Sequence, residues 1–294
     1  MTTPPVVVGV DGSEESLRAV EWAAREANRQ GAALRIVSAP AMPPRMWVSS
    51  PAPAGVAKAL GDVPRRALGE AITRAREVAP GLLVDTDLLA GPPAQMVTAS
   101  GSGALMLVVG ARGAGGFAAM LLGSVSRYAA MHASCPVAVV RKETSAVHRE
   151  VAVGVRHPYD ASATLEFAFE EAARRRATLV AVHAWYWSPA AFGYPGASKA
   201  TAEYSALGEV SAEVSRNLAE TLRTWREKYP DVPVREDIVQ GHPARVLANY
   251  TARADLVVIG RHGEHAAGPA IGAIQHGVLN HAHGPVVIVP EGAD

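Results

Sequence analysis

Gly110-Ala-Arg-Gly113 and, nine residues further on, Gly123-Ser-Val-Ser126 are the stretches from which the fold of this chain can be inferred. They follow the apolar run Ala104 to Val109, which predicts a buried strand. Glycine lets backbone N–H groups approach an anion closely, and a helix that begins near Gly123 would point the positive end of its dipole at the same charge. Because open parallel sheets bind ligands at the carboxyl ends of their strands, the pattern predicts a phosphate site there. A glycine-rich turn without a ligand is the alternative.

The second half of the chain repeats the first. Val6-Val-Val-Gly-Val-Asp-Gly-Ser13 aligns without a gap with Val151-Ala-Val-Gly-Val-Arg-His-Pro158, at an offset of 145 residues. Further on, Ala104 to Gly113 aligns with Ala254 to Gly263 at an offset of 150 residues. Repeats of this length are too long for a solenoid, so we expect two complete domains of ordinary size.

Each copy alternates apolar strands with amphipathic helices. The first copy predicts strands at 6–10, 34–39, 83–90, 105–109 and 137–140, and helices at 16–30, 64–78, 94–100 and 124–133. Valine-rich strands joined by helical crossovers predict an α/β fold of two repeated, doubly wound domains with helices on both faces of a parallel sheet. We expect the domains to cover residues 1–142 and 150–294, with the mostly polar segment 141–150 as the linker.

The order of these motifs is specific. A strand ending in Val8-Gly-Val-Asp-Gly-Ser13, the Gly-x-x-Gly piece, nine residues, Gly-Ser and a closing Pro136-Val-Ala-Val-Val140 strand together resemble the universal stress protein family. The resemblance covers nearly the whole chain as a tandem pair. It implies a five-stranded parallel sheet per domain, of the adenine nucleotide alpha hydrolase-like kind, and frequent ATP binding. It also implies pairing of domains about their last strands and a regulatory rather than a metabolic role.

The resemblance also indicates where the nucleoside would lie in the first copy. Asp11 ends the first strand, where its carboxylate can accept a hydrogen bond from an adenine amino group or a ribose hydroxyl, and the family uses the matching position for this end of the ligand. An N-cap for the following helix is the alternative role, for which Asp11 or Ser13 is suitable. Ile36 matches the position on the second strand whose backbone contacts adenine in relatives, although any buried strand would also place an aliphatic residue there.

The phosphate end follows in the same way. The positions that match phosphate and ribose contacts are Gly110, Gly113, Gly123 and Ser124, followed by Val125 and Ser126. The Ser124 hydroxyl is placed to bond a phosphate oxygen or a Mg²⁺ ion, a role that can coexist with capping a helix. Arg112 and Arg127 could add positive charge, although solvated arginines are more common on a loop and a helix. We therefore expect ATP, with Mg²⁺, in the N-terminal domain.

The second copy departs from this motif in three places. Arg156 replaces Asp11, the spacer between Gly263 and Gly272 is eight residues instead of nine, and Ala273 replaces Ser124. Each change weakens a nucleotide site, so we expect this domain to be a degenerate copy with a structural or pairing role. His262-Gly-Glu-His265 does not have the spacing of a zinc-protease helix, and no metal site is expected.

Composition excludes several classes of function. Lys and Arg together number 28, as do Asp and Glu, so there is no excess of positive charge for binding nucleic acid. No positively charged segment precedes Val6 and no apolar run approaches the ~18 residues that span a bilayer, which predicts a cytoplasmic protein without membrane insertion. The single cysteine, Cys135, begins a predicted buried strand and is expected to pack there.

No catalytic constellation is present. The sequence has no Ser-His-Asp or Cys-His signature and no Gly-Lys-Ser/Thr phosphate loop. The leading hypothesis is a stress-associated ATP-binding regulator that is not an enzyme, and the alternatives are a slow ATPase or an interaction module without nucleotide. We also expect a homodimer or an internal pseudo-dimer that pairs the apolar last strands, Val137 to Val140 and Val286 to Val289, since an exposed apolar edge favours aggregation. The regulatory protein partner is not identified by the sequence.

Overall fold

The computed structural model describes residues 3–39, 54–113, 122–141, 147–156, 162–185, 200–261 and 272–291, with the backbone alone for 54–61 and 200–211. The strands are β1 (Val6–Val10), β2 (Leu34–Ser38), β3 (Val84–Leu88), β4 (Met106–Gly110), β5 (Val137–Val140), β6 (Glu150–Gly154), β7 (Thr178–Trp185), β8 (Val234–Gln240), β9 (Leu256–Arg261) and β10 (Val286–Pro290). The helices are α1 (Glu14–Gln30), α2 (Ala54–Val78), α3 (Pro93–Ser100), α4 (Ser124–His132), α5 (Ser162–Arg175), α6 (Ala200–Lys228), α7 (Pro243–Tyr250) and α8 (Ala273–His281). None of these helices is both long and apolar enough to cross a membrane within the part described.

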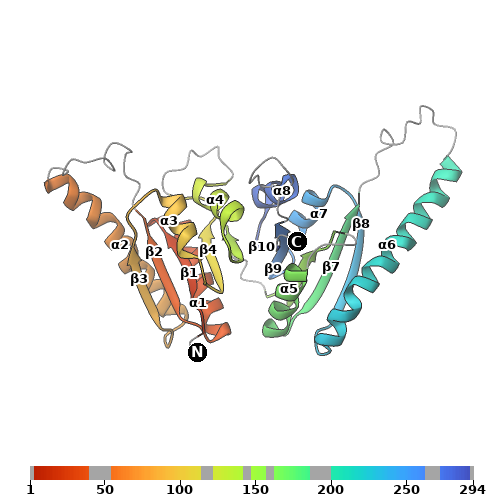
Figure 1. The fold of residues 1–294 in the computed structure, drawn as a ribbon, viewed down its shortest axis with the longest axis horizontal. Coiled ribbons are helices and arrows are strands. Elements are labelled where there is room, and N and C mark those ends of the chain that lie inside the picture. The colour runs from red at the N-terminus through yellow and green to blue at the C-terminus, as the bar shows by residue number, and fades with distance from the viewer. Residues whose placement is uncertain are drawn as a thin grey trace.

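All the strands form one ten-stranded sheet in the order β3-β2-β1-β4-β5-β10-β9-β6-β7-β8 (Figure 1). Pairing is parallel within each half, and the halves meet where β5 and β10 pair antiparallel, with Val286 opposite Val139 and Ile288 opposite Val137. This arrangement confirms the α/β fold with two repeated domains. It also confirms that the last strands pair within the chain, which covers an apolar edge that each half would otherwise expose.

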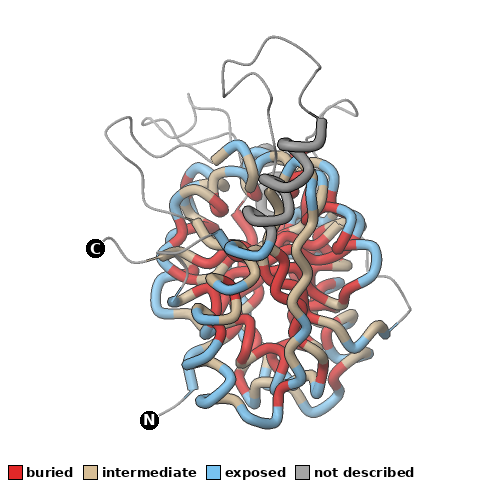
Figure 2. Tube along the Cα trace, turned by 90° about the vertical axis from the view of Figure 1, so that its right-hand side faces the viewer, coloured by how far each residue is buried: buried red, intermediate tan, exposed pale blue. Residues whose placement is uncertain are grey.

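Helices cover both faces of the sheet. Successive side chains along each strand point to opposite faces, so alternate residues pack in different cores. Val6, Val8 and Val10 enter a core with α1, α2, α5 and α6, whereas Val7 enters the opposite core with α3, α4, α7 and α8. The strands are therefore apolar at successive positions, as expected for a sheet buried on both sides. Figure 2 shows this buried centre as a continuous red layer. Both cores contain residues of both halves, so the two domains share their hydrophobic interior.

The starts of two helices differ from the prediction by two residues or more, and α3 and α4 each differ by one residue at one end. α1 begins at Glu14 rather than Ser16, because Ser13 caps it by accepting a hydrogen bond from the Ser16 N–H. α2 begins at Ala54 and continues through Pro64, where the sequence predicted the first residue of the helix. Proline favours a first turn because it lacks an N–H group, but inside a helix it removes only one backbone donor. The expected start at Pro64 was therefore wrong.

A buried ionic cluster joins α1 to α5 across the two halves. The Glu26 and Glu171 side chains are fully buried, and Arg175 Nη2 lies 2.5 Å from Glu26 Oε2 and 3.0 Å from Glu171 Oε2. Burial alone would raise the pKa of Glu26, but the Arg175 and Arg29 guanidinium groups outweigh it and hold that pKa below its usual value. Burial, and then the neighbouring Glu26 carboxylate, raise the pKa of Glu171. Arg175 is therefore the group that makes two buried carboxylates compatible.

Arginines also join the halves on the α4 and α8 face. Arg141, which follows β5, donates from Nη2 to the Leu279 carbonyl oxygen over 3.1 Å, near the end of α8. Arg261, at the end of β9, donates to the Ala133 carbonyl oxygen over 2.7 Å and to that of Ala130 over 3.2 Å, near the end of α4. A cation at a helix C-terminus stabilises carbonyl groups that have no intrahelical donor.

Candidate functional site

The carboxyl ends of β1 and β4 meet at one edge of the sheet and bring the two predicted ends of the nucleotide site together. β1 pairs with β4 in parallel, with Val8 opposite Val108. Asp11 follows β1, and Gly110 ends β4. A Cβ atom placed on Gly113 would lie 2.2 Å from Asp11 Oδ2, so these two residues are direct neighbours. The residue that follows β1 and the glycine loop that follows β4 thus lie side by side at this edge of the sheet.

The Asp11 carboxylate is oriented by the residues that start α1. Its Oδ1 accepts hydrogen bonds from the Ser13 backbone N–H over 3.0 Å and from the Ser13 hydroxyl over 2.7 Å. Ser13, and not Asp11, is the helix cap, since its hydroxyl oxygen accepts the bond from the Ser16 N–H. Asp11 is exposed, and its second oxygen faces Gly113. The sequence left open whether Asp11 or Ser13 caps the helix. In the structure Ser13 is the cap, and Asp11 faces the glycine loop.

Two glycines of the loop are explained by close approach. At Gly110 a Cβ atom would lie 3.0 Å from the backbone carbonyl carbon and oxygen of Glu15, so glycine lets the first turn of α1 pack against the end of β4. At Gly113 the neighbour is the Asp11 carboxylate, and φ is not in the left-handed region. Gly123 has φ −74° and ψ 162°, which any residue can adopt, and a Cβ there would make only ordinary contacts. Packing within the protein does not require glycine at 123.

The first turn of α4 presents donors to this edge. Gly123 is the N-cap residue and provides no side-chain hydrogen bond, so the N–H groups of the first turn remain for other partners. Ser124 is exposed, and Val125 packs partly against the core. The Ser126 side chain is buried, and its hydroxyl donates to the Ala111 carbonyl oxygen over 3.0 Å. That hydroxyl therefore closes the loop, and only the backbone of Ser126 belongs with the exposed donors.

Ile36 lies inside the sheet and away from this edge, and its predicted backbone contact with adenine stays a prediction. It is the middle residue of β2, fully buried, and it is paired with Val8 on one side and Thr86 on the other. The strand ends two residues later at Ser38, and Ala39 is the described residue that follows at the edge.

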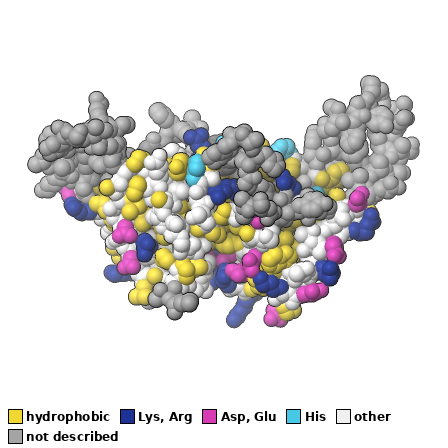
Figure 3. Space-filling model, viewed as in Figure 1, with side chains coloured by type: hydrophobic (Ala, Val, Ile, Leu, Met, Phe, Trp, Pro, Cys, Tyr) yellow, Lys and Arg dark blue, Asp and Glu magenta, His cyan; other side chains and the backbone are white. Residues whose placement is uncertain are grey.

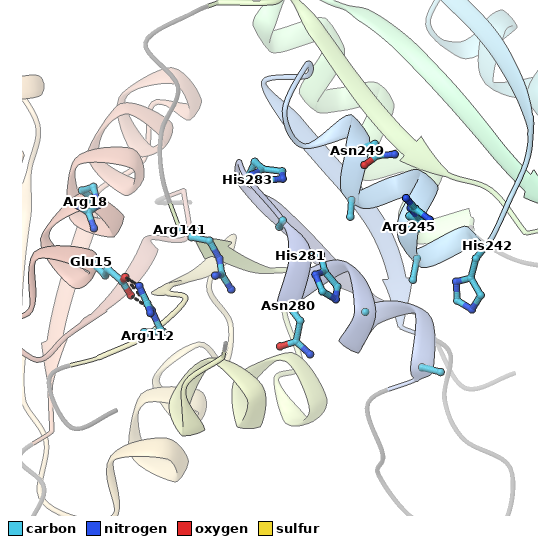
Figure 4. A pocket seen from close by; sticks show the side chains of 15 residues that line it. Glu15, Arg18, Arg112, Arg141, His242, Arg245, Asn249, Asn280, His281 and His283 are labelled. Atoms are coloured by element: carbon cyan, nitrogen blue, oxygen red, sulfur yellow. Dashed lines mark hydrogen bonds and ion pairs between the residues drawn. The ribbon is translucent and has the colours of Figure 1, made fainter. Parts of the chain in front are cut away.

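The arginines of the first motif are separated by the structure. Arg112 Nη2 lies 2.7 Å from Glu15 Oε1 at the start of α1, as Figure 4 shows, whereas Arg127 is exposed on α4. Residues 114–121 of the nine-residue spacer and the proline-rich segment 40–53 lie outside the described residues, as do 186–199 in the second copy.

The second domain closes its corresponding loop with a larger side chain. Gln275 aligns with Ser126, and its Nε2 donates to the Gly260 carbonyl oxygen over 2.7 Å. A Cβ atom placed on Gly272 would lie 2.2 Å from Gln275 Oε1, so the amide occupies the space just before α8. Ala273 is exposed at the first position of the helix, without the hydroxyl of Ser124. Gln275 is a fourth difference between the second copy and the nucleotide motif of the first, and it was not predicted. The alignment of Gln275 with Ser126 could have indicated it.

A carboxylate of the chain itself occupies the start of α5. Glu291 Oε1 accepts a hydrogen bond from the Thr164 N–H over 3.0 Å and another from the Thr164 hydroxyl, and Glu291 Oε2 accepts one from the Ala163 N–H over 3.3 Å. A helix N-terminus attracts anions, so this contact satisfies an attraction that a ligand would otherwise meet. Arg156 is exposed at the end of β6, and His157, Pro158, His262, Gly263, Glu264 and His265 lie outside the described residues.

Metal-ligating side chains do not gather in the described part of the chain. Within those residues no group of three or more His, Cys, Asp or Glu side chains is arranged to hold an ion. Cys135 is buried, and burial raises the pKa of its thiol to about 11, which disfavours the reactive thiolate.

Comparison with known proteins agrees with this geometry. The model of the universal stress protein family matches residues 3–141 and again residues 148–290. A universal stress protein of Mycobacterium tuberculosis is 35% identical over 96% of this chain and 96% of its own. The crystal structure of a universal stress protein from Archaeoglobus fulgidus covers 100% of this chain and 98% of its own, with 17% identity and a TM-score of 0.68. A shorter universal stress protein, solved in complex with cAMP, covers 48% of this chain and 99% of its own, with 32% identity and a TM-score of 0.38. The chain belongs to the universal stress protein family as a tandem two-domain member.

Proposed function

We propose that the N-terminal domain binds one ATP per chain between Asp11 and the Gly110 to Ser126 segment, and that the protein is a cytoplasmic regulator rather than an enzyme. One observation carries the proposal. Asp11, Gly113 and the first turn of α4 lie together at the edge where β1 and β4 end. This is where an open parallel sheet binds ligands.

The groups at this edge suit the parts of a nucleotide. Backbone N–H groups of the first turn of α4 and the exposed Ser124 hydroxyl are donors for phosphate oxygens. The Asp11 carboxylate is an acceptor for an adenine amino group or a ribose hydroxyl. A hydroxyl oxygen also suits Mg²⁺, so Ser124 is the side chain that would hold the ion beside the phosphates. The bound ion would neutralise phosphate charge next to the Asp11 carboxylate.

The second domain is proposed to bind no ATP. Its phosphate edge carries the Gln275 amide where the first domain has a small hydroxyl, and Ala273 where the first domain has Ser124. The Arg156 side chain stands where the first domain offers a carboxylate acceptor. The domain retains the strands that pair with the first half, so we assign it a structural role.

The regulatory role rests on the kind of groups present. Backbone N–H groups and hydroxyls can hold a triphosphate without transferring a proton, and binding alone does not promote cleavage. A slow ATPase is the second candidate, since nucleotide and Mg²⁺ would be held at the same edge. A nucleotide-free interaction module is the third.

Calorimetric titration of the full chain with ATP, ADP, AMP and cyclic AMP, with Mg²⁺ present, tests the proposal. We expect one site per chain that binds ATP, and no phosphate release above background at saturating ATP. Two equivalent sites per chain would contradict the assignment to one domain. Steady phosphate release, abolished by Gly113→Val, would establish the ATPase instead, and no heat with any nucleotide would leave the interaction module.

A further inference from the structure

A cavity of about 850 Å³ lies between the two domains, next to the proposed nucleotide edge, with which it shares Arg112. One wall is the first turn of α1 with Glu15, Arg18 and the adjacent Arg112 (Figure 4). The other wall is formed by α7 and by α8 along its whole length, and Arg141 lies between the walls. Because its lining comes from residues more than 100 positions apart, the cavity exists only when the two halves are paired.

Positive charge dominates this lining. The basic side chains are those of Arg18, Arg112, Arg141, Arg245, His242, His281 and His283. Among the described lining residues Glu15 is the single carboxylate, and it is engaged with Arg112 at 2.7 Å. Figure 3 shows dark blue and cyan side chains near the upper middle of the molecule, while most magenta carboxylates lie lower or toward the sides. Four arginines of a chain without net charge therefore lie at this junction.

The cations are close enough to affect one another. Burial, and then the positive charge of Arg112, lower the pKa of Arg141. On the first wall, Arg18 Nε is buried and has no hydrogen-bond partner among the described residues, and the nearest carboxylate to its guanidinium, Glu14, is 3.9 Å away. A buried donor without a partner costs free energy, as does the crowding of like charges. An anion in the cavity would offset the crowding of like charges between Arg112 and Arg141.

The size and the donors indicate the class of ligand. Cavities of roughly 300–1,000 Å³ hold small molecules, and guanidinium groups recognise phosphate through paired hydrogen bonds. Asn249 and Asn280 add neutral polar groups to the same lining. We propose that this cavity binds a small polyanion with two or more phosphate groups, and that the ligand bridges the two domains. The site is distinct from the proposed ATP site and does not depend on it.

Tripolyphosphate is the probe that tests the site in the full chain. Arg18→Gln changes the first wall and Arg245→Gln the second, and both side chains lie on helix surfaces, so folding should be retained. Each loss of a charged donor should weaken one tripolyphosphate site by about tenfold. Arg223→Gln on α6 is the matched control, because it removes one exposed arginine outside the cavity and should leave binding unchanged.

A third variant, Gly113→Val, distinguishes the cavity from the proposed ATP site. Calorimetry of Gly113→Val should retain the tripolyphosphate site that Arg245→Gln weakens, whatever happens to ATP. If ATP competes for that remaining site, the ligand is a nucleoside polyphosphate, and if it does not, the site prefers a free phosphate chain. If wild-type protein binds ATP nowhere but binds tripolyphosphate in an Arg245-dependent way, the proposed function fails and this inference stands.

Three results would overturn the inference. One is the absence of tripolyphosphate binding to the wild-type protein at physiological salt. Another is binding that Gly113→Val abolishes and that both Arg18→Gln and Arg245→Gln leave within twofold of wild type, which would place the anion at the glycine loop alone. The third is an equal loss in Arg223→Gln, which would show attraction to the overall surface instead of a site.

Discussion

In the N-terminal domain the loop before α4 is closed by the small hydroxyl of Ser126, whereas in the C-terminal domain the loop before α8 is closed by the long amide of Gln275. Both side chains reach back to a carbonyl oxygen at or just after the end of the preceding strand. The shorter one leaves the helix N-terminus accessible, and the longer one fills the space beside Gly272. The same fold can therefore hold the start of this helix to the preceding strand with either a short or a long side chain. The difference lies in a side chain that supports the loop rather than in the glycines that define the motif.

The comparison assumes that the two halves unfold together as one cooperative unit. Arg175→Met tests this assumption and has the largest expected effect on stability. The substitution leaves Glu26 and Glu171 buried without the cation between them, so the free energy of unfolding should fall by about 3–5 kcal/mol. The loss should be greater at pH 8 than at pH 5. A carboxyl group whose pKa is raised in the folded state, as that of Glu171 is, destabilises the fold as the pH rises through that value.

Denaturant unfolding measures the effect, and Arg174→Met is the matched control. Arg174 also contacts Glu171, but its side chain is 34% exposed, so its loss should cost less than about 1 kcal/mol. Two unfolding transitions in the wild-type protein, with only one shifted by Arg175→Met, would mean that the halves fold independently.

Paired glycine variants test whether only one half binds nucleotide. In Gly113→Val the new Cβ must displace the Asp11 carboxylate, so ATP affinity should fall by more than ~100-fold while folding is retained. In Gly272→Val the new Cβ meets only the flexible end of Gln275, and ATP affinity should not change. Calorimetry and circular dichroism of both variants decide the matter. Retention of ATP binding within twofold in Gly113→Val would make that glycine structural.

A substitution at Asp11 sharpens the assignment of the nucleoside end. In Asp11→Asn the side-chain oxygen can still accept the bonds from Ser13, but the charge is lost, so ATP should weaken by about 1–3 kcal/mol without a change in stability. Tripolyphosphate should bind no less tightly, because the removed charge lies beside the phosphate loop and repels it. Equal weakening of ATP and tripolyphosphate, measured by calorimetry, would instead assign Asp11 to the phosphates.

Restoring the first motif in the second domain should have the smallest effect. Gln275→Ser with Ala273→Ser recreates the small hydroxyl and the exposed serine, so the second domain should gain phosphate binding by about 0.5–1.5 kcal/mol. ATP itself should remain weak there, because Arg156 and the shorter spacer are unchanged. Titration with tripolyphosphate in a background that carries both Gly113→Val and Arg245→Gln, which weaken the two other proposed anion sites, measures this gain. Tight ATP binding in the restored domain would show that Gln275 and Ala273 alone account for the difference.

Local features of the sequence predicted the fold well because they are repeated along the chain. The valine-rich strands at 6–10 and 137–140 lie where their apolar runs predicted them, since a strand buried on both faces needs an apolar residue at every position. The limits of α1 were two residues off, because either Asp11 or Ser13 could have been the cap. Pro64 misplaced the start of α2, since one proline affects one backbone bond and does not decide where a long helix begins.

The sequence by itself therefore determined the two-domain α/β fold, the pairing of the last strands and the neighbourhood of Asp11 with the glycine loop. Only the tertiary structure decided which side chains fill that neighbourhood. Ile36 lies inside the sheet, the Ser126 hydroxyl bonds to the Ala111 carbonyl oxygen, and Arg112 pairs with Glu15. Periodicity reports which face of an element is buried, but the direction of a single side chain depends on partners far along the chain. The cavity between the domains is the extreme case, because neither half contains it alone.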